Sequence, residues 1–415
     1  SLMRSFEQIY VLDLHGNAKK KEHAPNGGKD ENVFDIEQGV AISLFVKKPG
    51  LERGAWHGEL WGSRLNKYVW LAEHEMRKVT ATALEVSTPL RMFIPKPRQG
   101  FSSNDWLLTD IFGIKTTGMK THRDDFAIGF QRLEVVRRLT DLVDQSSSFV
   151  YEKYKLKKTT SWSAEAAREA LSELSDPTRV IQQCYYRPFD IRWCLYGPYV
   201  MDRPRTELGE NVAGRQNLLL LCPRQTKNDW AVSITDQIPD HKSVSDYDTG
   251  YVFPVWSYDS NGRSEDFCTD FRSFIDARYP DQHYTPEEIL GTIYAVLHAP
   301  TYRTRYADFL RIDFPRIPFP EKQEDFDALS DLGWDLVQVH LLRDVPRRGL
   351  AQFEVKGDYT VEKVSWSEAE QAILINNSQR FHPVPKAVWE FHIGGYAVLE
   401  KYLKSRKGRK LSLDE

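Results

Sequence analysis

Short apolar or aromatic runs alternate with polar loops between residues 185 and 258, and this is the clearest pattern in the chain. The runs have the length of strands and the aromatic and β-branched composition that strands favour. Residues 218–222 are apolar throughout, which predicts a strand buried on both faces in the middle of a sheet. Pro223 has no backbone N–H and is expected to end that strand. We therefore predict a central sheet in this part of the chain.

Helical patterns lie on both sides of the predicted sheet. Apolar residues recur at helical spacing in residues 63–79, 130–143, 163–174, 285–298 and 325–342. Ser163 is expected to cap the third of these helices, and Thr285 with Glu288 forms a predicted capping box at the start of the fourth. Residues 314–320 contain three prolines and are expected to be extended.

Two apolar runs at the start of the chain, residues 8–14 and 39–46, are predicted to be buried strands. Two strands and a loop cannot bury a core alone. We expect them to form the edge of a larger sheet, whose other strands are either absent from the chain or supplied by later segments. Residues 353–374 also alternate like a sheet, and we expect Gly394 and Gly395 to mark a close backbone approach rather than a phosphate cradle.

These elements predict an α+β, multidomain protein with a mixed sheet and helical segments. Four parts are expected: strands in residues 1–50, connecting helices and loops in 51–180, the central sheet with helices in 181–350, and a strand–helix element in 351–415 that packs on the third part.

The composition is that of a folded protein, because 41% of the 415 residues are hydrophobic and 12% are aromatic. The formal net charge of −3 argues against a wholly basic nucleic-acid binder but allows a local basic patch. The four cysteines match no zinc spacing and are interpreted as free thiols of a reducing cytosol. No apolar run reaches the roughly 18 residues of a membrane span and no signal peptide is visible, so we expect a cytoplasmic protein without membrane contact.

The loop after residues 218–222 carries the first candidate site. Arg224, Gln225, Lys227 and Asn228 follow the predicted strand directly. Arg and Gln side chains can form paired hydrogen bonds with the edges of guanine and adenine in the major groove. A buried strand that ends in such a loop would hold these side chains for reading bases. The alternative is an ordinary solvated loop.

Other basic loops are candidates for contacts with phosphate groups. Arg203 and Arg205 flank a proline and suit phosphate positioning, whereas the alternative for both is an ion pair with Asp202 or Glu207. Two further loops hold the remaining candidate side chains, Lys242 in one and Lys115 and Arg123 in the other. The basic residues 406–410 resemble a DNA-contacting end, although frayed basic termini are common. The histidines show no metal-ligand spacing, so no metal site is predicted.

Several segments together resemble the C-terminal region of type ISP restriction–modification enzymes. They are residues 186–190, 250–254, 285–298, 313–319, 393–399 and 406–413, in that order. Residues 32–36 and 39–42 resemble the last strands of an adenine-N6 DNA methyltransferase core. The resemblance implies the edge strands of a Rossmann-like methyltransferase sheet, followed by a target-recognition domain that binds double-stranded DNA. It also implies missing N-terminal methyltransferase, translocase and nuclease parts, with S-adenosylmethionine as the cofactor of the parent enzyme.

The catalytic motifs of that family are missing from this sequence. Its methyltransferases need a glycine-rich loop after the first strand and an Asn/Asp-Pro-Pro-Tyr/Phe motif, whereas Asp176-Pro177 lacks the second proline and Gly27-Gly28 opens no helix. We therefore expect no catalytic residue and no cofactor in this fragment, which alone should be inactive. Two alternatives are a divergent S-adenosylmethionine-dependent methyltransferase that is active as it stands, and a protein-interaction scaffold.

Overall fold

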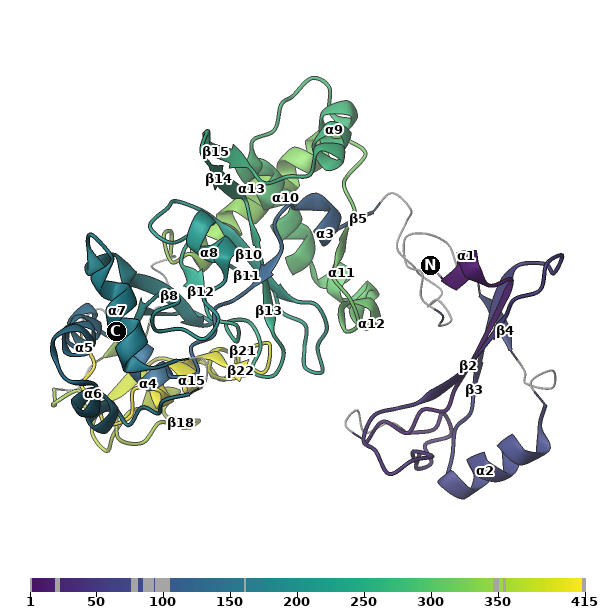
Figure 1. Ribbon diagram of the computed structural model, residues 1–415, viewed down its shortest axis with the longest axis horizontal. Helices are drawn as coiled ribbons and strands as arrows, with labels where there is room; N and C mark the ends of the chain where they lie inside the picture. The colour runs from purple at the N-terminus through teal and green to yellow at the C-terminus, as the bar shows by residue number, and fades with distance from the viewer. Residues whose placement is uncertain are drawn as a thin grey trace. The chain divides into compact units, whose positions relative to one another are not determined.

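The computed structural model describes residues 2–18, 23–75, 81–84, 93, 105–159, 162–345, 351–353 and 356–412. The chain forms two compact units, Ser1–Asn104 and Asp105–Glu415 (Figure 1). Both units mix helices and strands, which confirms the predicted α+β class. Within the described residues, no helix has both the length and the apolar character needed to cross a membrane.

The N-terminal unit is built on one four-stranded sheet with the order β2-β1-β3-β4. Its elements are α1 (Leu2–Ser5), β1 (Gln8–Asp13), β2 (Ala41–Val46), β3 (Gly54–Glu59), α2 (Arg64–Glu73) and β4 (Thr82–Leu84). β1 pairs antiparallel with β2 and parallel with β3, so later segments do supply further strands to the predicted pair. The boundary predicted at residue 50 falls between β2 and β3 of this sheet. Residues 76–79 of the predicted helix lie outside the described residues.

Strand β2 is not buried, and the prediction for residues 39–46 was wrong in this respect. Ile42, Leu44 and Phe45 are 42%, 44% and 38% exposed. The strand lies at the edge of the sheet, and successive side chains of a strand point to opposite faces. Apolar surface therefore remains open on both faces of β2.

A buried ion pair joins α2 to the loop between β1 and β2. The side chains of Lys67 and Asp30 are both fully buried, and Lys67 Nζ lies 2.7 Å from Asp30 Oδ1. Lys67 Nζ also donates to the backbone carbonyls of Leu14 and Glu31, each at 2.7 Å. The Asp30 carboxylate accepts two backbone N–H groups at 2.6 and 2.8 Å. Both charges are therefore paired and hydrogen-bonded, which is the condition for keeping ions in a protein interior.

Between residues 116 and 254, the second unit contains two four-stranded sheets where the sequence predicted one. Their orders are β11-β10-β13-β6 and β12-β8-β9-β7. The strands are β6 (Thr116–Thr117), β7 (Ile128–Gly129), β8 (Ile181–Arg187), β9 (Asp190–Leu195), β10 (Leu219–Pro223), β11 (Ser233–Thr235), β12 (Ile238–Pro239) and β13 (Gly250–Pro254). The prediction of a single central sheet was wrong. β8 and β9 pair with each other as a hairpin, whereas β10 pairs with β11 and β13.

Strand β10 confirms the most definite of the strand predictions. All five of its residues are buried, and it lies between β11 and β13. The strand ends at Pro223, as expected for a residue that has no N–H to donate. The four cysteines are free, and three of them are buried.

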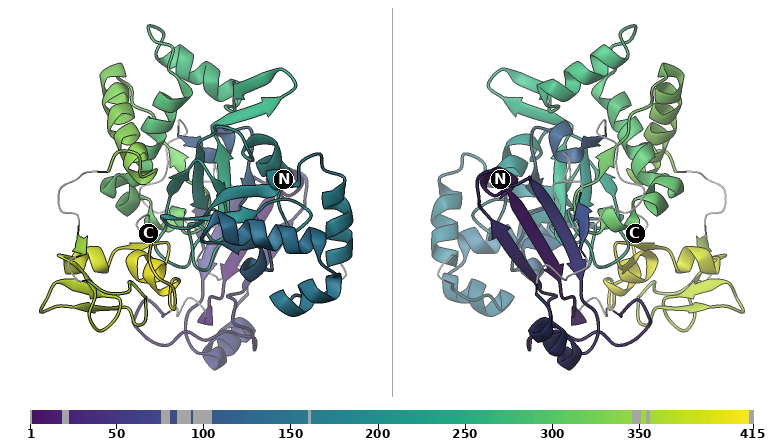
Figure 2. Two further views of the ribbon diagram at one scale, coloured as in Figure 1. Left: turned by 90° about the vertical axis from the view of Figure 1, so that its left-hand side faces the viewer. Right: turned by 90° about the vertical axis from the view of Figure 1, so that its right-hand side faces the viewer.

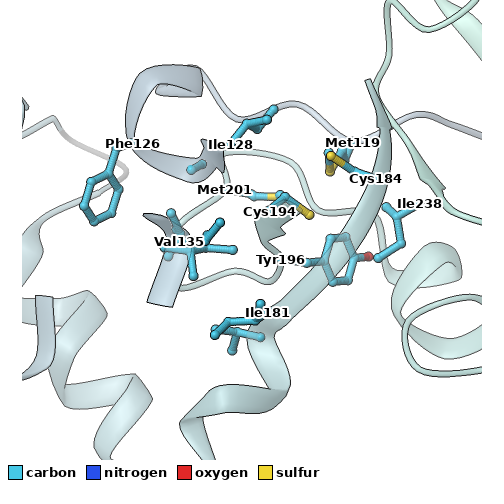
Figure 3. Packing of buried hydrophobic residues seen from close by; sticks show 14 of the residues in the cluster. Met119, Phe126, Ile128, Val135, Ile181, Cys184, Cys194, Tyr196, Met201 and Ile238 are labelled. Atoms are coloured by element: carbon cyan, nitrogen blue, oxygen red, sulfur yellow. The ribbon is translucent and has the colours of Figure 1, made fainter. Parts of the chain in front are cut away.

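Three helices cover the sheet that contains β8 and β9. They are α5 (Arg132–Asp144), α6 (Ser147–Tyr154) and α7 (Ala164–Ser172). Apolar side chains from these helices and from β8 and β9 form one core, which Figure 3 shows in part through Val135, Ile181, Cys184 and Cys194. Ser163 caps α7 as predicted, since its side chain accepts the N–H of Ala166.

Helices α10 (Pro286–His298) and α13 (Gln323–His340) pack at close backbone distance. A Cβ atom added to Gly333 would lie 1.8 Å from the carbonyl oxygen of Gly291. A Cβ atom added to Gly291 would lie 2.4 Å from the carbonyl oxygen of Ser330. Both separations are far inside van der Waals contact, so this helix crossing requires glycine at both positions. The predicted capping box at the start of α10 is also present.

Shorter elements complete the first part of the second unit. They are β5 (Trp106–Leu107), α3 (Leu108–Ile111), α4 (Asp124–Ala127), α8 (Thr206–Asn211), β14 (Trp256–Asp259), β15 (Gly262–Glu265), α9 (Thr269–Arg278), α11 (Pro300–Arg305), α12 (Ala307–Leu310) and β16 (Arg316–Ile317). β16 pairs with β5, which confirms the extended conformation expected for the proline-rich residues 314–320.

A small C-terminal sheet with the order β17-β20-β19-β18 and the elements after it form the last part of the unit. The elements are β17 (Gln352–Phe353), β18 (Ser365–Ser367), β19 (Ala372–Leu374), β20 (Arg380–His382), α14 (Lys386–Trp389), β21 (His392–Ile393), β22 (Tyr396–Ala397) and α15 (Val398–Lys404). Figure 2 shows this part and helices α5–α7 on two different sides of the central strands.

Arg406 is neither frayed nor exposed, in contrast to what was expected for residues 406–410. Its side chain is 2% exposed, and Nη2 lies 3.0 Å from Asp190 Oδ1 in β9. Arg192 contacts the other carboxylate oxygen of Asp190 at 2.6 Å. Asp190 thus holds two guanidinium groups inside the protein, and one of them attaches the C-terminal part to the sheet that contains β8 and β9.

Asp266 provides a prediction for pH-dependent stability. Its side chain is 7% exposed and accepts the N–H of Ile114 at 2.7 Å, and burial raises its pKa from 3.8 to about 6. Between these values the folded state binds more protons than the unfolded state, so stability falls as the pH rises from about 4 to 6. Asp266→Asn should therefore stabilise the protein above pH 6, by on the order of 1–3 kcal/mol.

Urea unfolding of the wild type and of Asp266→Asn from pH 4 to 8 measures this effect. The advantage of the variant should be largest above pH 6 and disappear toward pH 4. Asp229→Asn, at an exposed position, serves as the control. An equal advantage of Asp266→Asn at every pH would contradict the assignment.

Candidate nucleic-acid interface

Two loops meet at one end of the β11-β10-β13-β6 sheet. The 224–229 loop follows β10, and the 240–249 loop connects β12 to β13. They are adjacent because β10 and β13 are antiparallel neighbours, with Pro223 paired to Gly250. The sheet therefore brings together four of the predicted site residues, Arg224, Gln225, Lys227 and Asn228, with a fifth, Lys242.

Side-chain contacts fix the two loops to each other. Asn228 Nδ2 donates to Asp246 Oδ1 at 2.6 Å, and Lys227 Nζ donates to the hydroxyl of Tyr247 at 3.1 Å. Lys242 Nζ donates to the backbone carbonyl of Tyr247. The Tyr247 ring is 57% exposed and lies 4.4 Å from Lys227 Nζ and 5.7 Å from Lys242 Nζ. This arrangement presents an exposed aromatic ring with two ammonium groups close to it.

The β21–β22 hairpin supports the 240–249 loop from the C-terminal part of the chain. Its tip, Gly394 and Gly395, has φ angles of +54° and +91°. A Cβ atom on Gly394 would lie 1.9 Å from the carbonyl oxygen of Val244, and one on Gly395 would lie 2.4 Å from Asp246 Oδ1. The glycines therefore make the tight backbone approach that the sequence predicted.

Arg224 lies above a buried aromatic ring. Its side chain is 56% exposed, and Nε lies 3.0 Å from Asp313 Oδ1. The guanidinium carbon is 6.0 Å from the centre of the Phe314 ring, and Lys115 Nζ is 5.6 Å from the same ring. Lys115, predicted as a phosphate contact from a separate loop, therefore lies near Arg224. Gln225 is also exposed.

Arg203 and Arg205 lie on another segment of the unit. The backbone N–H of Arg203 donates to the backbone carbonyl of Lys120 at 2.9 Å. Arg203 Nε lies 3.8 Å from Asp202 Oδ2, which is the ion pair that the sequence offered as the alternative. That side chain is 60% exposed. Arg205 precedes α8 with φ +71° and is half-buried. No contact joins either side chain to the 224–229 loop among the described residues.

Arg123 is used inside the protein. Its guanidinium donates to the carbonyl of Val200 at 2.5 Å and to that of Thr121 at 3.1 Å, and it lies 4.5 Å from the Trp162 ring. Desolvation by burial lowers the pKa of this group. Its donors are directed to backbone oxygens, and we therefore leave Arg123 out of the interface proposed below.

Sequence reasoning missed Tyr247, Asp313 and Phe314. Asp313 and Phe314 lie in one of the segments that carry the family resemblance, but nothing in their spacing relates them to Arg224, 89 residues earlier. The position of Tyr247 follows from pairing between β10 and β13. Composition offered no signal for any of the three.

The chain belongs to the family described as the type ISP C-terminal specificity domain, whose model matches residues 110–415. This confirms the resemblance found in the sequence. No curated protein matches the chain significantly.

Three solved structures share the fold. They are a DrdV–DNA complex at 21% identity and TM-score 0.62, a nuclease-deletion mutant of the type ISP enzyme LlaGI with a DNA substrate mimic at 20% and 0.59, and the ATP-dependent type ISP enzyme LlaBIII bound to DNA at 19% and 0.64. Each alignment covers 98% of this chain but only 44%, 40% and 29% of those chains respectively. The chain thus spans less than half the length of these relatives.

Proposed function

We propose that this chain recognises a DNA sequence as the specificity part of a restriction–modification enzyme. The observation that carries the proposal is the pair of loops at the end of β10, where Arg224, Gln225, Lys227 and Lys242 present basic and amide groups on a rigid support. Support also comes from family membership and from the DNA present in the three similar structures.

The side chains of the two loops suggest a division of tasks. Arg224 and Gln225 are exposed and can offer paired hydrogen bonds to base edges in the major groove. Lys227, Lys242 and Lys115 suit phosphate groups, which fix register without reading sequence. Lys115 and Lys227 are exposed, and Lys242 is half-buried.

We further propose that the N-terminal unit is the edge of a methyltransferase sheet that precedes it in the parent enzyme. The open edge of β2 and its exposed Ile42, Leu44 and Phe45 suit a missing sheet neighbour. The parent would transfer the methyl group of S-adenosylmethionine to adenine and would also cut DNA, whereas this chain alone would do neither. Heat released on titration with S-adenosylmethionine would favour the alternative of an active, divergent methyltransferase.

Arg224→Ala tests the proposed reading site. If Arg224 pairs with guanine, its loss should reduce discrimination between cognate and non-cognate duplexes by about 1–3 kcal/mol, or roughly 5- to 150-fold. The cognate site is first selected from a random duplex library with the wild-type protein. Fluorescence anisotropy with cognate and scrambled duplexes then compares the wild type and the variant.

Arg179→Ala provides the matched control, because Arg179 is 82% exposed and lies in a different segment. It should leave discrimination unchanged. Unchanged discrimination in Arg224→Ala as well would remove Arg224 from the reading site. Neutralisation of DNA phosphates makes the affinity for DNA fall steeply as the salt concentration rises. If the affinity of the wild type for duplexes did not change with salt concentration, this would argue against DNA binding itself.

A further inference from the structure

We infer that Asp313 is a positioning residue that sets Arg224 for bidentate recognition of guanine. The inference rests on the proposed function and deepens it by naming the base and the residue that orients its reader. Its starting point is the 3.0 Å contact between Arg224 Nε and Asp313 Oδ1.

The geometry of this contact leaves the two Nη atoms of the Arg224 guanidinium open to a ligand. Arginine has five N–H donors in a planar fork, one on Nε and four on the two Nη atoms. Asp313 takes the Nε donor, and in the described part of the chain the Nη atoms of Arg224 donate no hydrogen bond. The two Nη atoms are the pair that fits O6 and N7 of guanine in the major groove. A side chain that is 56% exposed gives a base access to these two atoms.

Both partners are held by rigid parts of the fold. The N–H of Asp313 donates to the carbonyl of Phe309 at 3.1 Å, directly after α12. The next residue, Phe314, is 7% exposed and packs edge-on against Tyr251 and Phe253, with ring centres 4.9 and 5.6 Å apart. These contacts fix the Asp313 backbone beside the sheet end.

The 224–229 loop is attached to the same segment. The N–H of Thr226 donates to the carbonyl of Arg311 at 3.1 Å, so a backbone hydrogen bond joins the loop to the segment that contains Asp313. An arginine already held by one hydrogen bond loses less rotamer freedom when it meets a base. Positioning of this kind raises discrimination rather than general affinity.

The alternative for the Arg224–Asp313 contact is an ordinary surface ion pair. Removing a carboxylate from a DNA-facing surface would then strengthen binding to every duplex, because a negative charge beside phosphates is lost. If Asp313 positions Arg224, its removal should weaken the preference for guanine at one base pair. The affinity for scrambled duplexes should then stay unchanged or increase. The two interpretations therefore differ in whether the preference for guanine at one base pair is lost.

The experiment measures binding of Asp313→Ala and Asp313→Asn to the cognate duplex, to a scrambled duplex, and to cognate duplexes with each guanine replaced in turn. Asp313→Ala should reduce discrimination at one guanine by about 5- to 20-fold, and Arg224→Ala should act at the same base pair. The double variant should lose little more than Arg224→Ala alone, since Asp313 acts through Arg224. Asp313→Asn retains an acceptor oxygen and should recover part of the preference.

Asp308→Ala is the matched control, because Asp308 is an exposed carboxylate in the neighbouring helix α12. It removes the same charge and should change affinity for all duplexes equally. Thermal unfolding confirms that each variant is folded. If Asp313→Ala behaves like Asp308→Ala while Arg224→Ala loses its guanine preference, the positioning role is wrong and the proposed reading site stands. If neither Arg224→Ala nor Asp313→Ala changes discrimination, the reading site itself is wrong.

Discussion

Gly333→Ala is expected to destabilise the second unit by about 3 kcal/mol. The added methyl group would lie 1.8 Å from the carbonyl oxygen of Gly291, which belongs to the backbone of α10 and cannot rotate away. The helices would have to separate, and the buried contacts along α10 would be lost with them. Alanine favours the helical conformation by only about 0.8–1 kcal/mol relative to glycine, so the clash dominates.

Urea unfolding followed by far-ultraviolet circular dichroism measures the loss. Gly209→Ala in α8 is the matched control, because a Cβ atom there would meet Tyr196 at an ordinary 3.6 Å. That variant should be neutral or slightly more stable. A Gly333→Ala protein as stable as Gly209→Ala would show that α10 and α13 do not approach each other as described.

Lys67→Met is expected to cost the N-terminal unit about 3–5 kcal/mol, the usual effect of removing one partner of a buried ion pair. Methionine has a similar length but no donor, so the Asp30 carboxylate would remain buried with only its two backbone partners. The carbonyls of Leu14 and Glu31 would also lose the donor that links them to α2. Trp70 and Leu71 of α2 would still pack against Leu12, Leu14 and Val33, so the loss should weaken the unit rather than detach the helix.

Hydrogen–deuterium exchange of backbone amides in residues 8–18 and 54–73 measures the effect locally. Protection there should fall strongly in Lys67→Met, while residues 181–223 keep theirs. Lys29→Met is the control, since Lys29 is 81% exposed and pairs with Glu31 at the surface, where ion pairs contribute about 0–1 kcal/mol. Equal protection in the two variants would contradict the role of the buried pair.

Local patterns predicted single elements well in this chain. The apolar run that became β10, its end at Pro223 and the capping box of α10 each depend on neighbouring residues only. The division into two sheets depends on which strands pair. The composition of a strand does not identify the strand with which it pairs. The exposure of β2 could not be predicted either, because an apolar strand looks the same whether or not a neighbour covers it.

The candidate site was predicted in part for the same reason. Arg224 and Lys227 follow a strand whose burial could be predicted from its apolar residues, so their place at the end of a sheet was expected. Arg406 was misjudged because the carboxylate that buries it, Asp190, lies 216 residues away. Asp313 was overlooked for the equivalent reason. Contacts between distant residues decide which charges face solvent, and periodicity does not report them.

The link between Arg406 and Asp190 also bears on how the protein is made. A ribosome releases β9 long before it adds residue 406, so during synthesis Asp190 has Arg192 as its guanidinium partner and lacks the second. The Asp190 carboxylate in β9 therefore gains its second guanidinium donor only when the nascent chain has emerged through Arg406. A message truncated upstream of that codon would yield a product in which Oδ1 of a buried carboxylate lacks its guanidinium donor, a defect that proteases which remove incomplete polypeptides can exploit.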